Sequence, residues 1–477
     1  MCSYNAMTLH GYPASGVPTC ADTNLLTKLA RETFGFDGYI TGDCGAAQDV
    51  WSAHKFGGDA AGAAAASLTA GMDVDCGSFV KNNGMEALNS GKLSSAALDS
   101  AVGHLFRLRI RLGYFDPAES TPWGNASHLD LNYSAHFETA LRAAREGIVL
   151  LSHKRNVLPL KAKIKLAVSG PNADNAANMQ GIDCHGVPPY LITPIQGLGN
   201  FSTLSYPGPG CSMGKKNDTA GFAAVATAAA AADATVLVLG LDPSIEYEMR
   251  DRTDLLLPGS QAALVASVRS AMGADKPLIV VLMGGGVIDT SPIDALVDAV
   301  LWCGYPGQAG GQAIAEIIFG KVVPSGRSPL TWYANEYASD ASPTAVSMLD
   351  MGMRPSSAAA VMSSQGSTEP AGPYPLHGPN PGRTYRFVSK PEMVRYEFGH
   401  GLTIGASFSY GSLALSDAHT SAASIDAVVT AADAPRERYK APTLLSVSVT
   451  VSNSGKRAAG HSLLLFASPP NAGKNGR

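Results

Sequence analysis

The sequence has little charge, and the charge it has is balanced. Asp, Glu, Lys and Arg make up only 16% of the 477 residues, the formal net charge is −4, and the isoelectric point is about 6.3. Nucleic acids and anionic membranes are bound by concentrated Lys and Arg, so this composition argues against both as partners. With 45% hydrophobic residues, the chain has the balance of a globular protein and suits a neutral or weakly charged ligand.

Long apolar runs and a secretion signal are missing too. No apolar stretch is long enough to cross a bilayer, and the alanine run at residues 228–232 ends at Asp233. The chain opens on Met1-Cys2-Ser3-Tyr4-Asn5, without the basic and apolar regions of a leader.

Paired-cysteine motifs are absent, although seven cysteines are spread along the chain. Without a C-x-x-C pair, neither a zinc ribbon nor a thioredoxin-like site is expected. The cysteines could all be buried thiols, or six could form three disulfides in an oxidising compartment. Four N-x-S/T sequons, at Asn125, Asn132, Asn200 and Asn217, favour the second interpretation. An extracellular protein without a leader suggests that its natural beginning lies upstream.

The first part of the chain predicts strands that alternate with helices. Residues 36–41 and 72–75 are strand-like, whereas residues 60–70 and 94–112 have helical patterns. This order is typical of parallel strands joined by helical crossovers. Only about three strands fit before Tyr114, whereas a complete eight-stranded α/β barrel takes about 250 residues.

A second α/β region follows a Pro-, Gly-, Asn- and Ser-rich linker at residues 115–133. The patterns predict helices at residues 136–151, 221–232, 260–272 and 307–319. They predict strands at residues 164–169, 234–240, 277–283 and 299–302. Because these strands are apolar throughout, we expect a sheet buried on both faces, as in a doubly wound fold.

The last part of the chain changes character. Residues 336–381 have no periodicity and are rich in Ser, Pro, Met and Gly, which indicates a linker or an insertion. Alternation at residues 444–452 and 462–468 then predicts the first strands of a β-sandwich.

Asp43 stands where a reactive carboxylate would be expected. It follows the predicted strand at residues 36–41 and is flanked by glycines, within residues 38–45 (GYITGDCG). Catalytic groups of α/β barrels lie at the C-terminal ends of strands. A turn or a helix N-cap also favours aspartate, so position alone leaves both interpretations open.

A second acidic segment follows the predicted strand at residues 234–240. It has four carboxylates within ten residues, at Asp242, Glu246, Glu248 and Asp251. A solvated acidic loop would look the same. Together with Asp43, however, the segment could supply the two carboxyl groups of a retaining glycosidase, one an ionised nucleophile and the other a protonated acid.

Other motifs give weaker evidence for a functional site. Asp73 and Asp75 with His54 lack a recognisable metal-ligand spacing, so structural roles are expected. The triple glycine at residues 284–286 lacks the nucleotide-binding patterns and is interpreted as a tight turn.

Several segments, taken in order, resemble glycoside hydrolase family 3, and the resemblance runs through nearly the whole chain. Cys44 follows the candidate nucleophile, as in the β-xylosidase and arabinofuranosidase branch, where many β-glucosidase-like members have Trp. The segments that carry the resemblance are residues 1–5, 16–20, 36–45, 72–76, 148–160, 240–252, 257–259, 302–311, 326–327, 381–387 and 398–402.

The resemblance implies roles for individual residues. Asp43 would be the nucleophile and Glu246 the acid/base, with Glu248 in reserve; Glu248 and Tyr4 would contact substrate. The implied reaction removes terminal β-D-xylosyl residues from xylan-derived oligosaccharides with retention of configuration, and it needs no metal or organic cofactor. A β-glucosidase, an α-L-arabinofuranosidase and a catalytically inactive truncated fragment remain as alternatives, and the oligomeric state stays open.

The resemblance also implies an α/β multidomain architecture and an extracellular location. Expected disulfides are Cys2–Cys20, Cys44–Cys76 and Cys184–Cys211, with Cys303 free. The expected domains are the C-terminal part of a (β/α)8 barrel at 1–115, a linker at 116–135, an α/β sandwich at 136–335, a linker or insertion at 336–400, and a partial fibronectin type III-like domain at 401–477. On typical barrel length, about 150–200 residues would be missing upstream, and the chain alone is expected to fold poorly.

Overall fold

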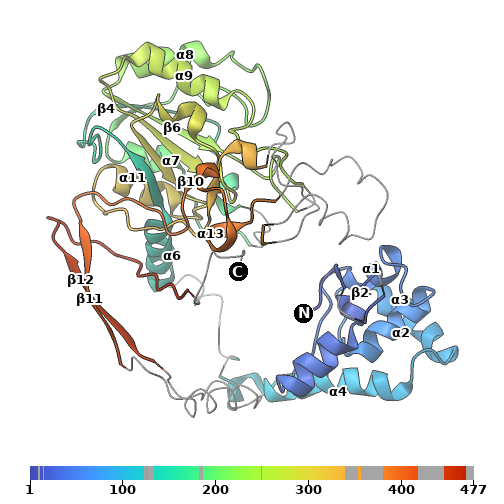
Figure 1. The fold of residues 1–477 in the computed structure, drawn as a ribbon. Coiled ribbons are helices and arrows are strands. Elements are labelled where there is room, and N and C mark those ends of the chain that lie inside the picture. The colour runs from blue at the N-terminus through green and yellow to red at the C-terminus, as the bar shows by residue number, and fades with distance from the viewer. Residues whose placement is uncertain are drawn as a thin grey trace. The chain divides into compact units, whose positions relative to one another are not determined.

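The computed structural model describes residues 1–8, 11–13, 15–122, 124, 126, 134–181, 186–248, 250–338, 353–355, 380–416 and 445–468 (Figure 1). The chain divides into two compact units. The first comprises Met1–Ser127 and Tyr410–Thr450, and the second His128–Ser409 and Val451–Arg477. In the described part of the chain, no helix combines the length and apolarity that crossing a membrane requires.

The second unit is built on a six-stranded sheet in the order β3-β8-β7-β6-β4-β5. All neighbouring strands are parallel except β3, which runs antiparallel to β8. The strands are β3 (Val149–His153), β4 (Lys165–Ser169), β5 (Thr203–Ser205), β6 (Ala234–Gly240), β7 (Leu278–Met283) and β8 (Ala299–Trp302). Every residue of β6, β7 and β8 is buried, which confirms the sheet covered on both faces that the apolar runs predict.

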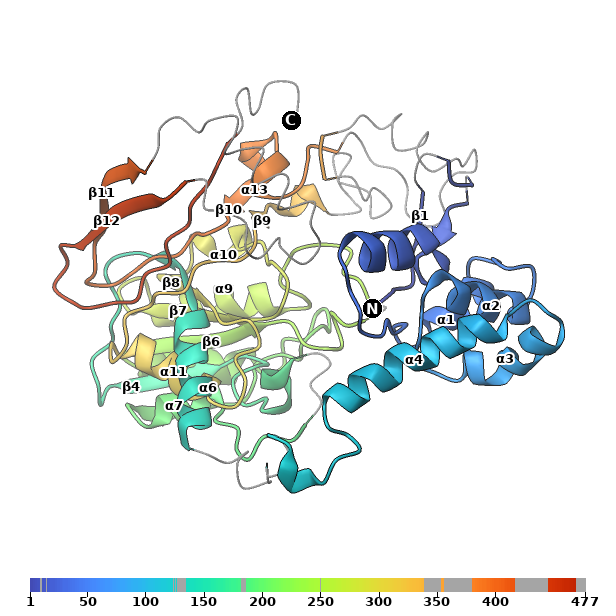
Figure 2. The same ribbon diagram turned by 90° about the horizontal axis from the view of Figure 1, so that it is seen from below.

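Helices cover this sheet on two sides (Figures 1 and 2). One apolar core joins the sheet to α6 (Ser134–Gly147), α7 (Pro194–Gly199) and α11 (Gly310–Ile318). The other joins it to α8 (Phe222–Ala231), α9 (Gln261–Met272) and the short α10 (Ser291–Asp294). Alternate residues of one strand serve the two cores, since Val236 and Val238 belong to the first and Leu237 and Leu239 to the second.

The first unit contains short strands and helices around its own core. Its elements are β1 (Ala6–Met7), β2 (Val17–Pro18), the π-helical η2 (Asn24–Thr33), α1 (Ala46–Ser52), α2 (Ala60–Ala70), α3 (Phe79–Asn89) and α4 (Ser95–Arg111). The alanine-rich α2 has clear ends. Asp59 accepts a hydrogen bond from the amide of Gly62 at its start, and Gly71, at φ +113°, ends it.

Some predicted elements are wrong in type or extent. The strand expected at residues 72–75 is reduced to an isolated bridge at Val74. The expected strand at residues 36–41 is reduced to isolated parallel bridges at Thr41 and Gly42, because no continuous partner strand lies beside it in the described residues. The helix expected over residues 136–151 ends at Gly147. The apolar residues that follow pair with β8 as the edge strand β3, since burial against the sheet outweighs continuation of the helix.

The remaining strands are short or pair only locally. β9 (Trp332–Tyr333) pairs with β10 (Val394–Tyr396), near α13 (Thr384–Phe387). β11 (Phe408–Leu415) and β12 (Val447–Asn453) form a two-stranded, mostly exposed ribbon. The alternation at residues 444–452 thus predicted a strand correctly, whereas residues 462–468 form none. Short 3-10 turns are η1 (Thr19–Ala21), η3 (Ala118–Ser120), η4 (Ala177–Gln180), η5 (Asn335–Tyr337) and η6 (Pro391–Met393).

Candidate active site

Asp43 lies where three chain segments of the first unit run side by side. Parallel bridges join Cys2 to Gly42 and Thr41 to Val74. The amide of Asp43 donates to the carbonyl of Cys2 at 2.8 Å, so the backbone on either side of the carboxylate is tied to its neighbours. Asp43 therefore stands at the end of a short parallel arrangement, directly before α1.

The Asp43 carboxylate is half-buried and sparingly bonded. Its Oδ1 accepts a hydrogen bond from the amide of Cys44 at 2.7 Å, while Oδ2 has no hydrogen-bond partner among the described residues. The phenol of Tyr4 donates to the Cys44 carbonyl at 3.0 Å, and His54 Nε2 lies 2.7 Å from the Tyr4 carbonyl. Tyr4 thus supports the Asp43 turn, and one carboxylate oxygen keeps a free lone-pair set for chemistry.

Two disulfides constrain the turn that contains Asp43, and both pairings confirm what the resemblance implied. Cys2 pairs with Cys20, and Cys44 pairs with Cys76. The second disulfide joins the residue next to Asp43 to the segment that follows Val74. Both bridges restrict the chain around the candidate nucleophile.

The third expected disulfide, Cys184–Cys211, falls partly outside the described residues. Cys211 is a buried free thiol, and its expected partner, Cys184, lies outside the described residues. Burial in the apolar core, with Asp218 nearby, raises the pKa of Cys211 to about 11. Cys303 is also a buried free thiol, as expected.

Asp73 is an ion-pair centre of the first unit. Its side chain is 2% exposed and lies 2.5 Å from Arg31 Nη2 and 2.9 Å from His104 Nδ1. It also accepts a hydrogen bond from the amide of Ile40 at 2.6 Å. Asp75 accepts from the amide of Val80. Among the described residues no cluster of three or more His, Cys, Asp or Glu could hold a metal ion. Both aspartates bond to neighbouring groups of the protein.

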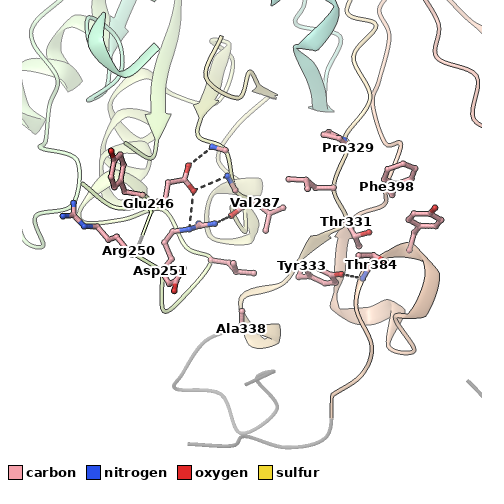
Figure 3. Close-up of a pocket in the computed structure, with 17 residues that line it drawn as sticks. Glu246, Arg250, Asp251, Val287, Pro329, Thr331, Tyr333, Ala338, Thr384 and Phe398 are labelled. Carbon is pink, nitrogen blue, oxygen red and sulfur yellow. Dashed lines mark hydrogen bonds and ion pairs between the residues drawn. The ribbon is translucent and has the colours of Figure 1, made fainter. Parts of the chain in front are cut away.

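Glu246 lies in the second unit, in the loop after β6, and points into the glycine loop after β7 (Figure 3). Its Oε1 accepts hydrogen bonds from the Gly285 amide and the Tyr305 hydroxyl, both at 2.6 Å. Its Oε2 accepts from the Gly286 amide at 3.2 Å and lies 3.8 Å from Arg252 Nε. The side chain is only 14% exposed. All four neighbours are donors, which is the environment of a bound carboxylate.

Glu248 has the opposite surroundings. Tyr247 and Arg250 pair across a tight turn through backbone hydrogen bonds of 3.3 and 2.9 Å, and Glu248 lies within that turn. Its side chain is exposed and makes no hydrogen bond or ion pair with other described residues. Arg250 Nη1 braces the turn by donating to the Pro243 carbonyl at 3.0 Å.

A cleft of about 760 Å³ opens beside this turn. Figure 3 shows Glu246, Arg250 and Asp251 on one side and Tyr333, Thr384 and Phe398 on the other. The wall is largely apolar, with polar and charged groups from the loop. Aromatic faces next to charged and hydroxyl groups are the usual lining of a site for a neutral, partly apolar ligand.

Sequence reasoning missed the role of Tyr305 and of the glycine loop. The signal was available in the strand order: Glu246, Gly285 and Tyr305 each follow a parallel strand, and β6, β7 and β8 are neighbours. Loops at the carboxyl ends of adjacent parallel strands meet at one edge of the sheet.

Comparison with known proteins identifies the family. The model of the glycosyl hydrolase family 3 C-terminal domain matches residues 148–404. Probable beta-D-xylosidase 7 of Arabidopsis thaliana is 37% identical over 100% of this chain and 58% of its own length. Exo-1,4-beta-xylosidase xlnD of Emericella nidulans is 36% identical over 98% of this chain and 53% of its own length. The chain therefore spans a little over half of these curated relatives.

A solved structure gives the same result. A family 3 exo-beta-xylosidase, XlnD, in complex with a xylobiose aziridine activity-based probe, superimposes with a TM-score of 0.73 at 36% identity. The match covers 83% of this chain and 48% of that one. A β-glucosidase from Erythrobacter marinus has the same fold at 24% identity, with a TM-score of 0.65. The chain thus belongs to glycoside hydrolase family 3, and residues 148–404 form its C-terminal domain.

Proposed function

We propose that the protein removes terminal β-D-xylosyl residues from xylan-type oligosaccharides by a retaining mechanism. The observation that carries this proposal is the match of the whole chain to proteins named β-xylosidases, with Asp43 half-buried at a stapled strand end. One oxygen of Asp43 has no hydrogen-bond partner among the described residues, which suits attack on an anomeric carbon. The attack would form a glycosyl-enzyme, which water then hydrolyses.

The second carboxyl group comes from the loop after β6, where two glutamates compete. Glu246, the residue that the resemblance implies, accepts hydrogen bonds on both oxygens. To act as an acid, Glu246 must carry a proton. A proton on either carboxylate oxygen would point toward an N–H or O–H group that already donates to that oxygen. The geometry therefore favours Glu246 as a fixed carboxylate.

Glu248 fits the proton-transfer role better. It is exposed within a braced turn, and no donor among the described residues holds its carboxylate ionised. A substrate that covers the turn would remove water from this side chain, and desolvation favours the protonated form that a general acid needs. We therefore propose Asp43 as nucleophile and Glu248 as acid/base, in place of the order that the resemblance implies.

The cleft beside the turn suits the rest of an oligosaccharide. Tyr247, Tyr333, Tyr385 and Phe398 line it, and aromatic rings pack on the apolar faces of sugars. Arg250 and Asp251 add polar groups that could bond hydroxyls. A xylo-oligosaccharide is neutral, in agreement with the low charge of the chain. Tyr4, bonded to the Cys44 carbonyl, remains a predicted substrate contact.

The finer architecture belongs to the same proposal. Parallel bridges at Cys2, Thr41 and Val74, followed by helices, support the last strands of a (β/α)8 barrel in residues 1–115. The β11–β12 ribbon supports the first strands of a fibronectin-like sandwich in residues 401–477. Two disulfides and exposed sequon residues Asn200 and Asn217 support an extracellular location.

The function is tested with variants of each carboxylate. The protein, expressed with any flanking coding sequence, is assayed on nitrophenyl β-D-xyloside, β-D-glucoside and α-L-arabinofuranoside. Activity on the xyloside that falls by about 10³-fold or more in Asp43→Ala supports the proposal. Added azide should restore turnover in Glu248→Ala and give a β-xylosyl azide, because azide attacks the glycosyl-enzyme without base assistance. Azide rescue in Glu246→Ala alone would return the acid/base role to Glu246.

The second candidate function is α-L-arabinofuranosidase. A relative from Medicago sativa subsp. varia, 36% identical over 99% of this chain, is named beta-xylosidase/alpha-L-arabinofuranosidase 1. Equal or faster hydrolysis of the arabinofuranoside in the same assay would favour it. No hydrolysis of any substrate would favour a catalytically inactive fragment.

A further inference from the structure

The turn that contains Glu248 is clamped at both of its ends to the glycine loop after β7. Glu246, on the entering side, is bound by the amides of Gly285 and Gly286. Arg252, on the leaving side, donates from Nη2 to the carbonyl of Val287 at 2.9 Å and approaches Glu246 Oε2. Backbone hydrogen bonds between Tyr247 and Arg250 close the turn, and these two attachments set its direction relative to the sheet.

Tyr305 completes the clamp from the next strand. Its hydroxyl donates to Glu246 Oε1 at 2.6 Å, and Cys303 and Gly304 separate it from the end of β8 at Trp302. Gly181, at φ +74°, packs closely against the ring, since an added Cβ there would lie 2.8 Å from Tyr305 Cδ2. The short bond of the Tyr305 hydroxyl to a carboxylate is of the stronger, charge-assisted kind.

We propose that Tyr305 is a positioning residue, which fixes Glu246 in the amide pair and thereby holds the turn that presents Glu248. The inference rests on the proposed function, in which Glu248 transfers the proton. Burial, followed by the hydrogen bond to Glu246 and its charge, raises the pKa of Tyr305, so the phenol stays a donor throughout the physiological pH range.

A kinetic test distinguishes an effect on the position of the acid from an effect on the stability of the whole protein. Assistance by an acid matters for a poor leaving group such as phenol and little for 2,4-dinitrophenol. In Tyr305→Phe we expect kcat/KM for phenyl β-xyloside to fall about tenfold, since a misplaced acid loses part of its contribution. The value for the dinitrophenyl β-xyloside should stay within about twofold. A fall by the same factor for both substrates, or for neither, overturns the positioning role.

Tyr396→Phe is the matched control. Tyr396 is also half-buried in the second unit, and its hydroxyl lies 3.2 Å from Thr290 Oγ1, but it has no bond to the described residues of the Glu246 loop. We expect this variant to leave the ratio of the two kcat/KM values unchanged. A change equal to that of Tyr305→Phe would mean that any lost tyrosine hydroxyl has this effect, and would overturn the proposal.

Hydrogen exchange tests the clamp without reference to activity. In Tyr305→Phe, a peptide that covers residues 243–256 should exchange faster than in the unsubstituted protein, and in Tyr396→Phe it should not. Unchanged exchange in this peptide overturns the inference whether or not the protein is active. Faster exchange in a protein that hydrolyses no xyloside would support the clamp while refuting the proposed function.

Discussion

Substitution of Gly286 by alanine should destabilise the second unit through a collision at the clamp. A Cβ at this position would collide with Arg252 Nη2 and lie 3.0 Å from Glu246 Oε2. The Arg252 side chain is 15% exposed, and its guanidinium can withdraw only by giving up its bond to the Val287 carbonyl and its approach to Glu246. Loss of a hydrogen bond that involves a charged group costs about 1.5–3 kcal/mol.

We therefore expect Gly286→Ala to lower the free energy of unfolding by about 2 kcal/mol. For a domain of this size, that is a fall in Tm of about 3–4 °C. Gly285→Ala is the matched control, because a Cβ there would lie at ordinary contact distances of 3.4 Å from Glu246 Oε1 and 3.5 Å from Tyr305 Cε2. Its cost should stay below about 1 kcal/mol.

Calorimetry on the two variants and the unsubstituted protein measures the difference. Neither glycine has a positive φ, so the comparison isolates the collision from backbone strain. Equal Tm values for the two alanine variants would refute the close fit between the glycine loop, Glu246 and Arg252.

Two further predictions concern stability. Cys44→Ser should lower the free energy of unfolding of the first unit by about 2–4 kcal/mol, measured by urea unfolding, because the Cys44–Cys76 bridge closes a long loop; a midpoint that does not move would contradict this. Glu316 is buried, which alone would raise its pKa, but hydrogen bonds from Arg145 and Gln312 lower the pKa below its ordinary value of 4.5. Its contribution to stability is therefore present above pH 4.5 and is lost as pH falls through the folded pKa, so Glu316→Gln should flatten the acid limb of the stability–pH curve. An acid limb of unchanged slope would exclude this carboxylate as its source.

Local patterns predicted the elements whose physics is local. The buried strands β6 and β8 begin and end at the predicted residues, as does α2, because a continuous apolar run or a capped alanine stretch determines each on its own. The strand expected at residues 36–41 failed, since a strand needs partners and the segment has only bridges at Thr41 and Gly42. β3 was missed because its partner β8 lies about 150 residues away in sequence, so local patterns do not show the pairing. Pairing with β8 stabilises this segment as a strand more than continuation of the helix would.

The same distinction between local and long-range determinants applies to the residues of the candidate site. Asp43 could be found from one segment, as a carboxylate between glycines after an apolar run. The clamp could not, because Glu246, the glycine loop and Tyr305 come from three separate loops that meet only through the order of β6, β7 and β8. The resemblance implied Glu246 as the acid/base, with Glu248 in reserve; the proposal of Glu248 rests on the donors around Glu246, which meet only when the sheet is formed.

The account rests most heavily on Asp43 as the residue that bonds to the sugar. A 2-deoxy-2-fluoro β-xyloside with a good leaving group forms the glycosyl-enzyme quickly and hydrolyses it slowly, so the intermediate accumulates. Proteolysis and mass spectrometry of the labelled protein should place the fluoroxylosyl group on the peptide that contains Asp43, with no label in Asp43→Ala. If the protein is active before treatment and is inactivated by the reagent, a label on any other carboxylate would contradict the assignment.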